Sequence, residues 1–235
     1  MGPGDLVWER LGHNAVGIRD APTGRDVVYN WGMFSFDQPG FVGRFLRGEM
    51  MYWMASFGAA ETVRAYAADN REVVIQILDL TPAERLALRN FVEWNERPEN
   101  TYYAYDYFRD NCSTRARDAI DRVLGGMIRT KTERIATQLS YRDHALRLME
   151  QDKAVYTGFY VGLGQPADRK LTAWEEMFIP MTMRDRLRTL TVERNGVRAP
   201  LVLAESTLFR ATREPEAVQP RNLAPYFFAV GILLA

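Results

Sequence analysis

Asp106-Tyr107-Phe108-Arg109-Asp110-Asn111-Cys112-Ser113-Thr114-Arg115 is the stretch that contains the only cysteine among the 235 residues of the chain. Asp110 or Asn111 can cap a helix, and apolar residues at helical spacing predict that this helix continues until Gly125 and Gly126 end it. Cys112 then lies in the first helical turn, where unpaired N–H groups and the helix dipole favour a thiolate. We therefore expect Cys112 to be a nucleophile that faces the body of the domain and ionises more easily than an ordinary thiol.

The simplest alternative is that Cys112 is a small buried apolar residue, as most free cysteines are. The polar and charged residues on both sides of it favour the nucleophile. A thiol of this kind needs a base, and the chain offers only His13 and His144 as imidazoles. We expect His144 to be solvated, because it lies among charged residues of a helix predicted over 141–152. His13 is therefore the candidate base, although a lone histidine is more often a structural residue.

Composition sets limits on the partners. Thirty basic and thirty acidic residues cancel, so no overall field attracts nucleic acid, and we expect no nucleic-acid partner. One cysteine permits no internal disulfide, and the spacing of Cys and His residues predicts no zinc site. A calcium or magnesium site built from carboxylates alone stays open, but no motif marks one, and we assign no metal ligands. The N-terminal residues contain no export signal, so either the protein is cytoplasmic or such a signal has been removed.

Periodicity predicts an α+β fold in which an antiparallel sheet packs against helices. Strands are expected over 5–20 and 27–34, which pair as a hairpin and place His13 on a strand. Further strands are expected over 73–78, 102–108 and 156–163, and Asn195-Gly196 predicts another hairpin. Helices are expected over 59–68, from a capping box at Thr81, and around 174–178 until Pro180.

Two segments are unusually apolar. The run from 41 to 54 is either a core helix and strand or a groove that contacts lipid, and its candidate binding residues are Phe41, Phe45, Met51 and Trp53. The run from 226 to 235 is too short to span a bilayer, and we expect it to begin a membrane helix rather than to form a terminal core strand.

Five motifs in order along the chain resemble the Lnb family of bacterial lipoprotein N-acyltransferases, whose N-terminal domain is periplasmic. They are Gly12-His13-Asn14-Ala15, Tyr29-Asn30-Trp31-Gly32-Met33-Phe34, Asn70-Arg71-Glu72-Val73 with Leu78-Asp79-Leu80-Thr81, Tyr105 to Arg115, and Trp174-Glu175-Glu176-Met177-Phe178-Ile179-Pro180. More remotely, the order of histidine before cysteine is similar to that in circularly permuted papain-like enzymes, including NlpC-type peptidases and lecithin:retinol acyltransferases.

The resemblance implies a permuted papain-like core with a mixed α/β extension. We expect a catalytic core over 1–126, an extension over 127–213 and, over 214–235, a linker and an apolar, membrane-directed segment. The family's location implies the periplasmic side of the inner membrane.

The resemblance also implies a reaction. Cys112 takes an acyl chain from a phospholipid as a thioester and passes it to the N-terminal amine of a lipoprotein, with no cofactor. His13 acts as the base, and backbone N–H groups at the helix start hold the oxyanion. Asn30, with Asp37 behind it, is our candidate for the group that orients His13. Asn111 and Arg115 are expected to bind substrate beside the thiol.

Two other classes of function stay open. The same Cys–His pair serves amidases and peptidases of the cell wall, which need a polar cleft. A non-catalytic module that binds lipid or a partner would contain Cys112 only as a buried residue.

Overall fold

The structure is a computed structural model that describes residues 1–35, 37, 49–214 and 216–234. Packing divides the chain into two compact units. Unit 1 comprises Met1–Thr137 and Thr172–Arg213, and unit 2 comprises Gln138–Leu171 and Glu214–Ala235. The predicted extension is therefore divided between the units, because its residues 127–137 and 172–213 pack with residues 1–126. The roles assigned to the three predicted ranges stay predictions.

Unit 1 contains a four-stranded antiparallel sheet. Its strands, in spatial order, are β1 (Ala15–Asp20), β2 (Arg25–Met33), β3 (Met51–Gly58) and β5 (Tyr102–Ala104). In this register Ala15 pairs with Asn30, and Tyr52 pairs with Tyr103. The predicted α+β class with an antiparallel sheet is confirmed.

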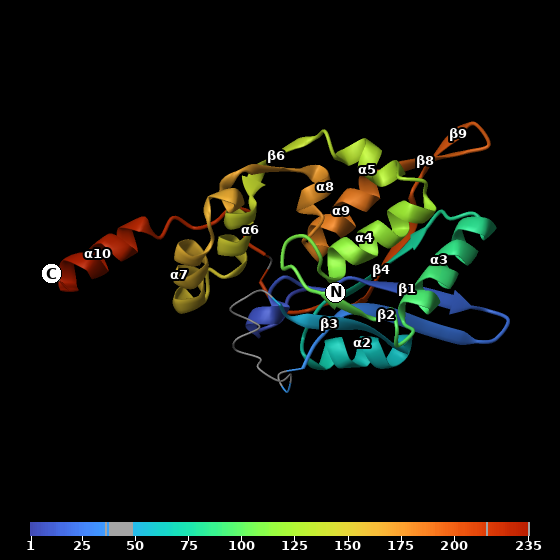
Figure 1. The fold of residues 1–235 in the computed structure, drawn as a ribbon, viewed down its shortest axis with the longest axis horizontal. Coiled ribbons are helices and arrows are strands. Elements are labelled where there is room, and N and C mark those ends of the chain that lie inside the picture. Colours follow the sequence, from blue (N-terminus) through green and yellow to red (C-terminus); the bar gives the residue numbers. More distant parts are fainter. Residues whose placement is uncertain (36, 38–48, 215, 235) are drawn as a thin grey trace. The chain divides into compact units, whose positions relative to one another are not determined.

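Three helices of unit 1 pack around this sheet. They are α2 (Ala59–Ala68), α3 (Pro82–Asn95) and α4 (Cys112–Val123). In Figure 1, α4 and α2 lie on opposite sides of the sheet. The predicted capping box starts α3, since Thr81 Oγ1 accepts a hydrogen bond from Glu84 N–H and the Glu84 carboxylate accepts one from Thr81 N–H.

The main core of unit 1 lies on the side of the sheet that faces α3 and α4. Tyr29 and Trp31 of β2 are fully buried there with apolar residues of both helices. One polar pair crosses this core. Trp31 Nε1 donates to Asn95 Oδ1 at 2.7 Å, and Asn95 Nδ2 donates to Asn100 O at 2.8 Å. The pair satisfies the buried indole N–H, as a buried tryptophan requires.

Smaller elements complete unit 1. They are η1 (Val7–Glu9), β4 (Val73–Leu78), α5 (Met127–Thr132), α8 (Ala173–Glu176), α9 (Pro180–Thr189), β8 (Thr191–Arg194), β9 (Val197–Pro200) and β10 (Val202–Phe209). β4 pairs with β10 and β8 with β9. Asn195 and Gly196, with φ of 50° and 76°, form the predicted hairpin turn. Two further strands, β6 (Ala136–Ser140) and β7 (Lys170–Thr172), pair with each other.

The predicted strand over 5–20 is wrong in its first part, because β1 begins only at Ala15. Gly12 adopts a φ of +83°, which is incompatible with a continuous strand. His13 therefore lies in the loop that leads into β1, where its N–H donates to Met1 O at 2.9 Å.

Unit 2 is helical over most of its described length. It contains α6 (Tyr141–Leu148), α7 (Lys153–Gly162), η2 (Gln165–Asp168) and α10 (Ala224–Leu234). The strand predicted over 156–163 is wrong, since Asp152 caps α7 through the N–H groups of Ala154 and Val155. The expectation that His144 lies in solvent is wrong, because its side chain is buried. Arg147 of the same helix donates a hydrogen bond to its Nδ1 at 3.0 Å and so gives the buried ring a polar partner.

The apolar run from 226 onward is helical as far as Leu234. Within the described ranges, no helix combines the length and the apolar character needed to cross a membrane.

Replacing Asn95 should destabilise the protein. Asn95→Ala leaves the buried Trp31 indole N–H without its acceptor, which costs about 1–3 kcal/mol of unfolding free energy. Asn100→Ala is the control, because it removes one exposed hydrogen bond to Trp94 O and should cost about 0.5 kcal/mol. Urea unfolding measures both values, and equal midpoints for the two variants would contradict the role given to this pair.

Candidate functional site

Cys112 is the first residue of α4, and its side chain is buried, with 7% of the residue's surface exposed. Asn111 caps the helix, because its Oδ1 accepts from Ser113 N–H and Thr114 N–H, each at 2.9 Å. Arg115 N–H bonds Asn111 O. In the described part of the chain, Cys112 N–H is therefore the one N–H of the first turn that these caps leave free for a ligand.

Asn111 is fully buried and uses both ends of its side-chain amide. Its Nδ2 donates to Tyr107 O at 2.9 Å and to Phe178 O at 3.0 Å. The residue holds the start of α4 against two other segments of unit 1. These bonds use its Oδ1 and both Nδ2 hydrogens, so the structure gives Asn111 a positioning role. Its expected contact with substrate stays a prediction.

His13 is hydrogen-bonded to Asn30, as predicted. His13 Nε2 lies 3.0 Å from Asn30 Oδ1, and Asn30 Nδ2 donates to Val28 O at 2.9 Å. The second bond fixes the amide so that its oxygen faces the ring. Nε2 then carries the proton, and Nδ1 presents a lone pair. Asp37, which we expected behind Asn30, is hydrogen-bonded to Ser35. Ser35 Oγ donates to the Asp37 carboxylate, and the backbone N–H of Asp37 donates to Ser35 Oγ.

Asn14, the residue after His13, links the loop to the start of α4. Asn14 Nδ2 donates to Ser113 Oγ at 3.0 Å, and the backbone N–H of Asn14 faces the Cys112 sulfur. The structure therefore brings residues 13 and 112 to the same place. Among the described residues, no hydrogen bond joins their side chains directly.

Gly32 permits the close approach of β2 to Cys112. It has a φ of +99° and lies at the irregularity between Trp31 and Met33 in the pairing of β2 with β3. A Cβ atom at this position would lie 3.7 Å from Cys112 Cβ. Only glycine adopts this backbone conformation readily, so Gly32 sets where the sheet passes beneath the thiol.

The imidazole of His13 is held by ring stacking on its other side. Its ring lies 6.1 Å from the ring of Tyr66 in α2, at an angle of 18°. The guanidinium of Arg71 lies 4.5 Å from the centre of the Tyr66 ring and forms an ion pair with Glu9 at 3.2 Å. Sequence reasoning did not identify this column, because only the fold brings the three side chains together.

Burial decides the protonation state of both candidate groups. It lowers the pKa of the partly buried His13 to about 3, although the hydrogen bond that His13 donates to Asn30 acts in the opposite direction. It also raises the pKa of the Cys112 thiol, although the N–H groups of Asn14 and Ser113 oppose this change. The expectation that Cys112 ionises easily is therefore wrong: desolvation outweighs the helix terminus. The resting pair is a neutral thiol and a neutral imidazole.

The chain was compared with known protein families and structures. A model of the Lnb N-terminal periplasmic domain matches residues 1–145. The chain belongs to the Lnb family. No curated protein and no solved structure matches it. The matched range includes each residue of the Lnb-family site described above apart from Phe178, which contributes a backbone oxygen.

Arg115 of this Lnb-family domain is engaged by its own segment. Its guanidinium forms two hydrogen bonds with the Asp110 carboxylate, at 2.6 and 2.8 Å, and lies 3.6 Å from the centre of the Tyr103 ring. The charge of Arg115 is thus paired within the chain, and its expected role in binding substrate stays a prediction.

Sequence reasoning missed a row of aromatic residues on the thiol side of the sheet. Ring centres lie 6.0 Å apart for Trp8 and Phe34, 5.2 Å for Phe34 and Tyr52, and 4.0 Å for Tyr52 and Tyr105. Tyr52 and Tyr105, at one end of the row, pack against the core cluster that contains Cys112. Burial raises the pKa of Tyr105.

The predicted lipid-binding residues are distributed differently. Met51 and Trp53 are half-buried and alternate with Tyr52 along β3, so they point away from the thiol side. Met50 and Met54 are buried. Phe41 and Phe45 lie outside the described residues.

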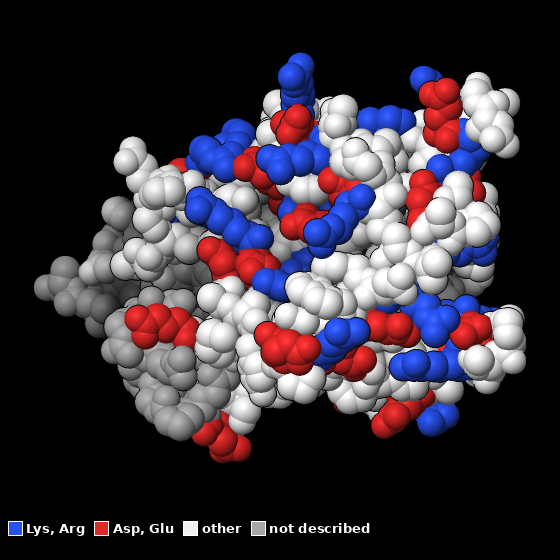
Figure 2. Space-filling model, turned by 45° about the vertical axis from the view of Figure 1, so that its right-hand side comes forward, with Lys and Arg blue, Asp and Glu red and all other residues white. Residues whose placement is uncertain are grey.

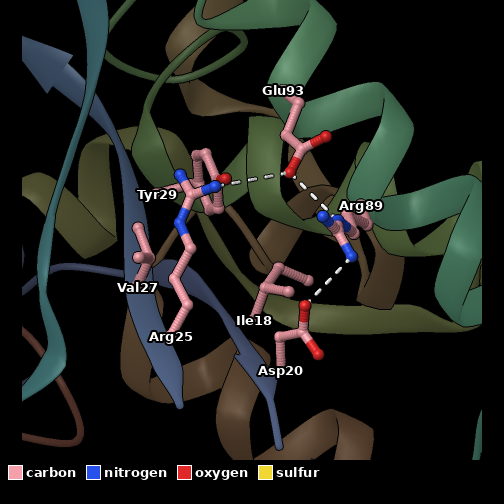
Figure 3. Close-up of a pocket in the computed structure, with 7 residues that line it drawn as sticks. All are labelled: Ile18, Asp20, Arg25, Val27, Tyr29, Arg89 and Glu93. Carbon is pink, nitrogen blue, oxygen red and sulfur yellow. Dashed lines mark hydrogen bonds and ion pairs between the residues drawn. The ribbon is translucent and has the colours of Figure 1, made fainter. Parts of the chain in front are cut away.

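Other features of the described residues lie outside the candidate site. A small hollow between the β1–β2 hairpin and α3 is lined by Tyr29 and charged residues, with Arg89 bridging Asp20 and Glu93 at 3.4 and 3.0 Å (Figure 3). Basic and acidic side chains are interspersed on the face in Figure 2. No group of three or more His, Cys, Asp or Glu residues is placed to hold a metal ion among the residues searched.

The raised pKa of Cys112 predicts slow alkylation at neutral pH. Iodoacetamide should modify the folded protein more slowly at pH 7 than the urea-unfolded chain, whose thiol has a pKa of about 8.5. The folded-state rate should rise with pH until the thiol ionises, above the pH at which the unfolded chain reaches its plateau. A folded-state rate that is already at its plateau at pH 7 would instead indicate a preformed thiolate.

Proposed function

We propose that this domain is a thiol acyltransferase that takes an acyl chain from a phospholipid and transfers it to the N-terminal amine of a lipoprotein. The proposal rests above all on the His13–Asn30 hydrogen bond. That bond leaves Nδ1 as the proton acceptor in a loop whose next residue, Asn14, contacts the helix start that carries Cys112. A merely buried cysteine does not explain an oriented imidazole in the loop that contacts the start of its helix.

The first half-reaction forms a thioester. His13 Nδ1 accepts the thiol proton as the Cys112 sulfur attacks the ester carbonyl carbon, so an S–C bond forms and the carbonyl π electrons move to oxygen. The oxyanion collapses, the C–O bond to the lysophospholipid breaks, and the leaving alkoxide takes the proton from the imidazolium. Cys112 N–H is available to the oxyanion, whereas Ser113 and Thr114 N–H already bond Asn111.

The second half-reaction uses the neutral imidazole again. The amine attacks the thioester carbonyl, His13 accepts a proton from the amine, and the sulfur leaves and is reprotonated. The low pKa of His13 keeps its Nδ1 lone pair free near pH 7, but it also makes the imidazole a weaker base than one that titrates near pH 7.

The aromatic row supports a lipid substrate over a polar one. It extends from Tyr105 near the thiol to Trp8, half of whose surface is exposed. Trp8 follows Leu6 and Val7, which are also exposed. Tryptophan with neighbouring aliphatic residues is typical of surfaces that enter the boundary of a bilayer. We propose that this end contacts the membrane surface and that the row accompanies the acyl chain toward Cys112.

Acyl transfer can be tested on the protein itself. After incubation with phosphatidylethanolamine vesicles, mass spectrometry should find one acyl group on the peptide that contains Cys112. Cys112→Ser should abolish the adduct, His13→Ala should slow its formation by at least about 10²-fold, and Asn30→Ala should slow it less. His144→Gln, at the only other histidine, is the matched control.

The products separate the alternatives. Free fatty acid released without any acceptor would indicate a hydrolase. Vesicle binding without an adduct on Cys112, and with the rates of all variants equal, would indicate a non-catalytic lipid-binding module.

Membrane contact can be tested at Trp8. Trp8→Asp should weaken binding to vesicles of phosphatidylethanolamine and phosphatidylglycerol by about 10-fold or more, because one large apolar side chain no longer enters the bilayer. Trp94→Asp is the control, since Trp94 of α3 is similarly exposed, at 47% against 50%. Cosedimentation measures both. Equal losses in the two variants would show that the row is not the membrane contact.

A further inference from the structure

Tyr103 presents a buried hydroxyl near the proposed nucleophile. The residue is 6% exposed, and its ring belongs to the same core cluster as Cys112. Within the described part of the chain, its hydroxyl oxygen has no hydrogen-bond partner. Buried hydroxyls nearly always have a partner, so an exception at a reaction centre indicates a group that bonds a ligand.

Three elements place this hydroxyl. Tyr103 lies in β5, directly opposite Tyr52 of β3, on the side of the sheet that carries the core. Its ring also lies 3.6 Å from the guanidinium of Arg115, which is three residues after Cys112 in α4. Burial, and then the charge of an ionised Cys112, raises the pKa of Tyr103. The hydroxyl therefore keeps its proton and can donate it to a hydrogen bond at neutral pH.

Arg115 strengthens this donor. Its guanidinium lies 3.6 Å from the centre of the Tyr103 ring and is held there by the two hydrogen bonds to Asp110. A cation over the ring face draws electron density from the phenol, and its influence on the pKa of Tyr103 is downward. The arrangement explains why Arg115 is fixed against the ring with its charge already paired.

We infer that the Tyr103 hydroxyl donates a hydrogen bond to the carbonyl oxygen of the acyl group while Cys112 attacks it, and so forms an oxyanion hole together with Cys112 N–H. This inference rests on the proposed thiol chemistry. As the S–C bond forms, the carbonyl π electrons move to the oxygen, and the bond from Tyr103 strengthens because that oxygen becomes negative. Tyr103 thereby becomes a catalytic residue, and Arg115 a positioning residue that acts through it.

Tyr103→Phe tests the inference, because it removes the hydroxyl and keeps the ring beneath Arg115. Acylation of Cys112 by p-nitrophenyl butyrate passes through an oxyanion and should slow by about 10²-fold. Alkylation by iodoacetamide displaces iodide without an oxyanion and should change less than about twofold, since the position and ionisation of the thiol are kept. The unfolding midpoint should be unchanged or higher, because a buried hydroxyl without a partner does not stabilise the fold.

Tyr29→Phe is the matched control. Tyr29 is a fully buried tyrosine of the same sheet, and it lines the hollow beside Arg25 and Glu93 (Figure 3). Both of its rates should match those of the wild type.

The possible results are distinct. Unchanged acylation in Tyr103→Phe, or equal slowing of acylation and alkylation, would overturn the role of the hydroxyl. Selective slowing with the p-nitrophenyl ester, in a protein that takes no acyl group from phospholipid vesicles, would support the inference and reject the lipid substrate. A wild-type Cys112 that neither donor acylates would overturn both.

Discussion

The capping of α4 by Asn111 is the interaction on which the candidate site depends. A single buried amide bonds Ser113 and Thr114 N–H through its oxygen and the carbonyls of Tyr107 and Phe178 through its nitrogen. The helix start is thereby fixed to a segment 67 residues away in the chain. These bonds use the neighbouring N–H donors, so, as far as the described residues show, Cys112 N–H is the donor of the first turn that remains for a ligand. The same residue thus determines both where the nucleophile lies and which backbone group accompanies it.

Burial sets the electrostatic character of the site. A helix start and the nearby N–H groups favour a thiolate, but desolvation of the sulfur outweighs them, and desolvation of His13 favours the neutral imidazole as well. In the proposed reaction, proton transfer from thiol to imidazole therefore accompanies the attack on the carbonyl and does not precede it. A neutral thiol is also a poor target for oxidants, which protects a lone cysteine in a periplasmic domain family.

The sequence predicted local features well and burial poorly. The helix from Cys112 to Val123, the capping box at Thr81 and the turn at Asn195 and Gly196 depend on neighbouring residues, and all are present. The contact of His13 with Asn30 was also expected, although the strand assigned to His13 was not formed. The pKa of Cys112 and the positions of Tyr66 and Tyr103 depend on segments far apart in the chain. Local sequence patterns contain no information about such packing. The sequence therefore could not predict that the Cys112 thiol would be desolvated.

The alternation of side chains along β3 and β5 explains why neighbouring apolar residues lie on different faces of the sheet. Tyr52 of β3 and Tyr103 of β5 point to the thiol side, whereas Met51 and Trp53 point to the other, because successive side chains leave a strand on opposite faces. A run of apolar residues in the sequence is therefore not a continuous apolar surface in the fold. In the proposed reaction, the tyrosine rings on the thiol side provide apolar area for the acyl chain, and their hydroxyls provide polar atoms at intervals along it. Tyrosine meets both demands where methionine meets only the first, so the aromatic row is the better match to a substrate with a polar carbonyl at the end of an apolar chain.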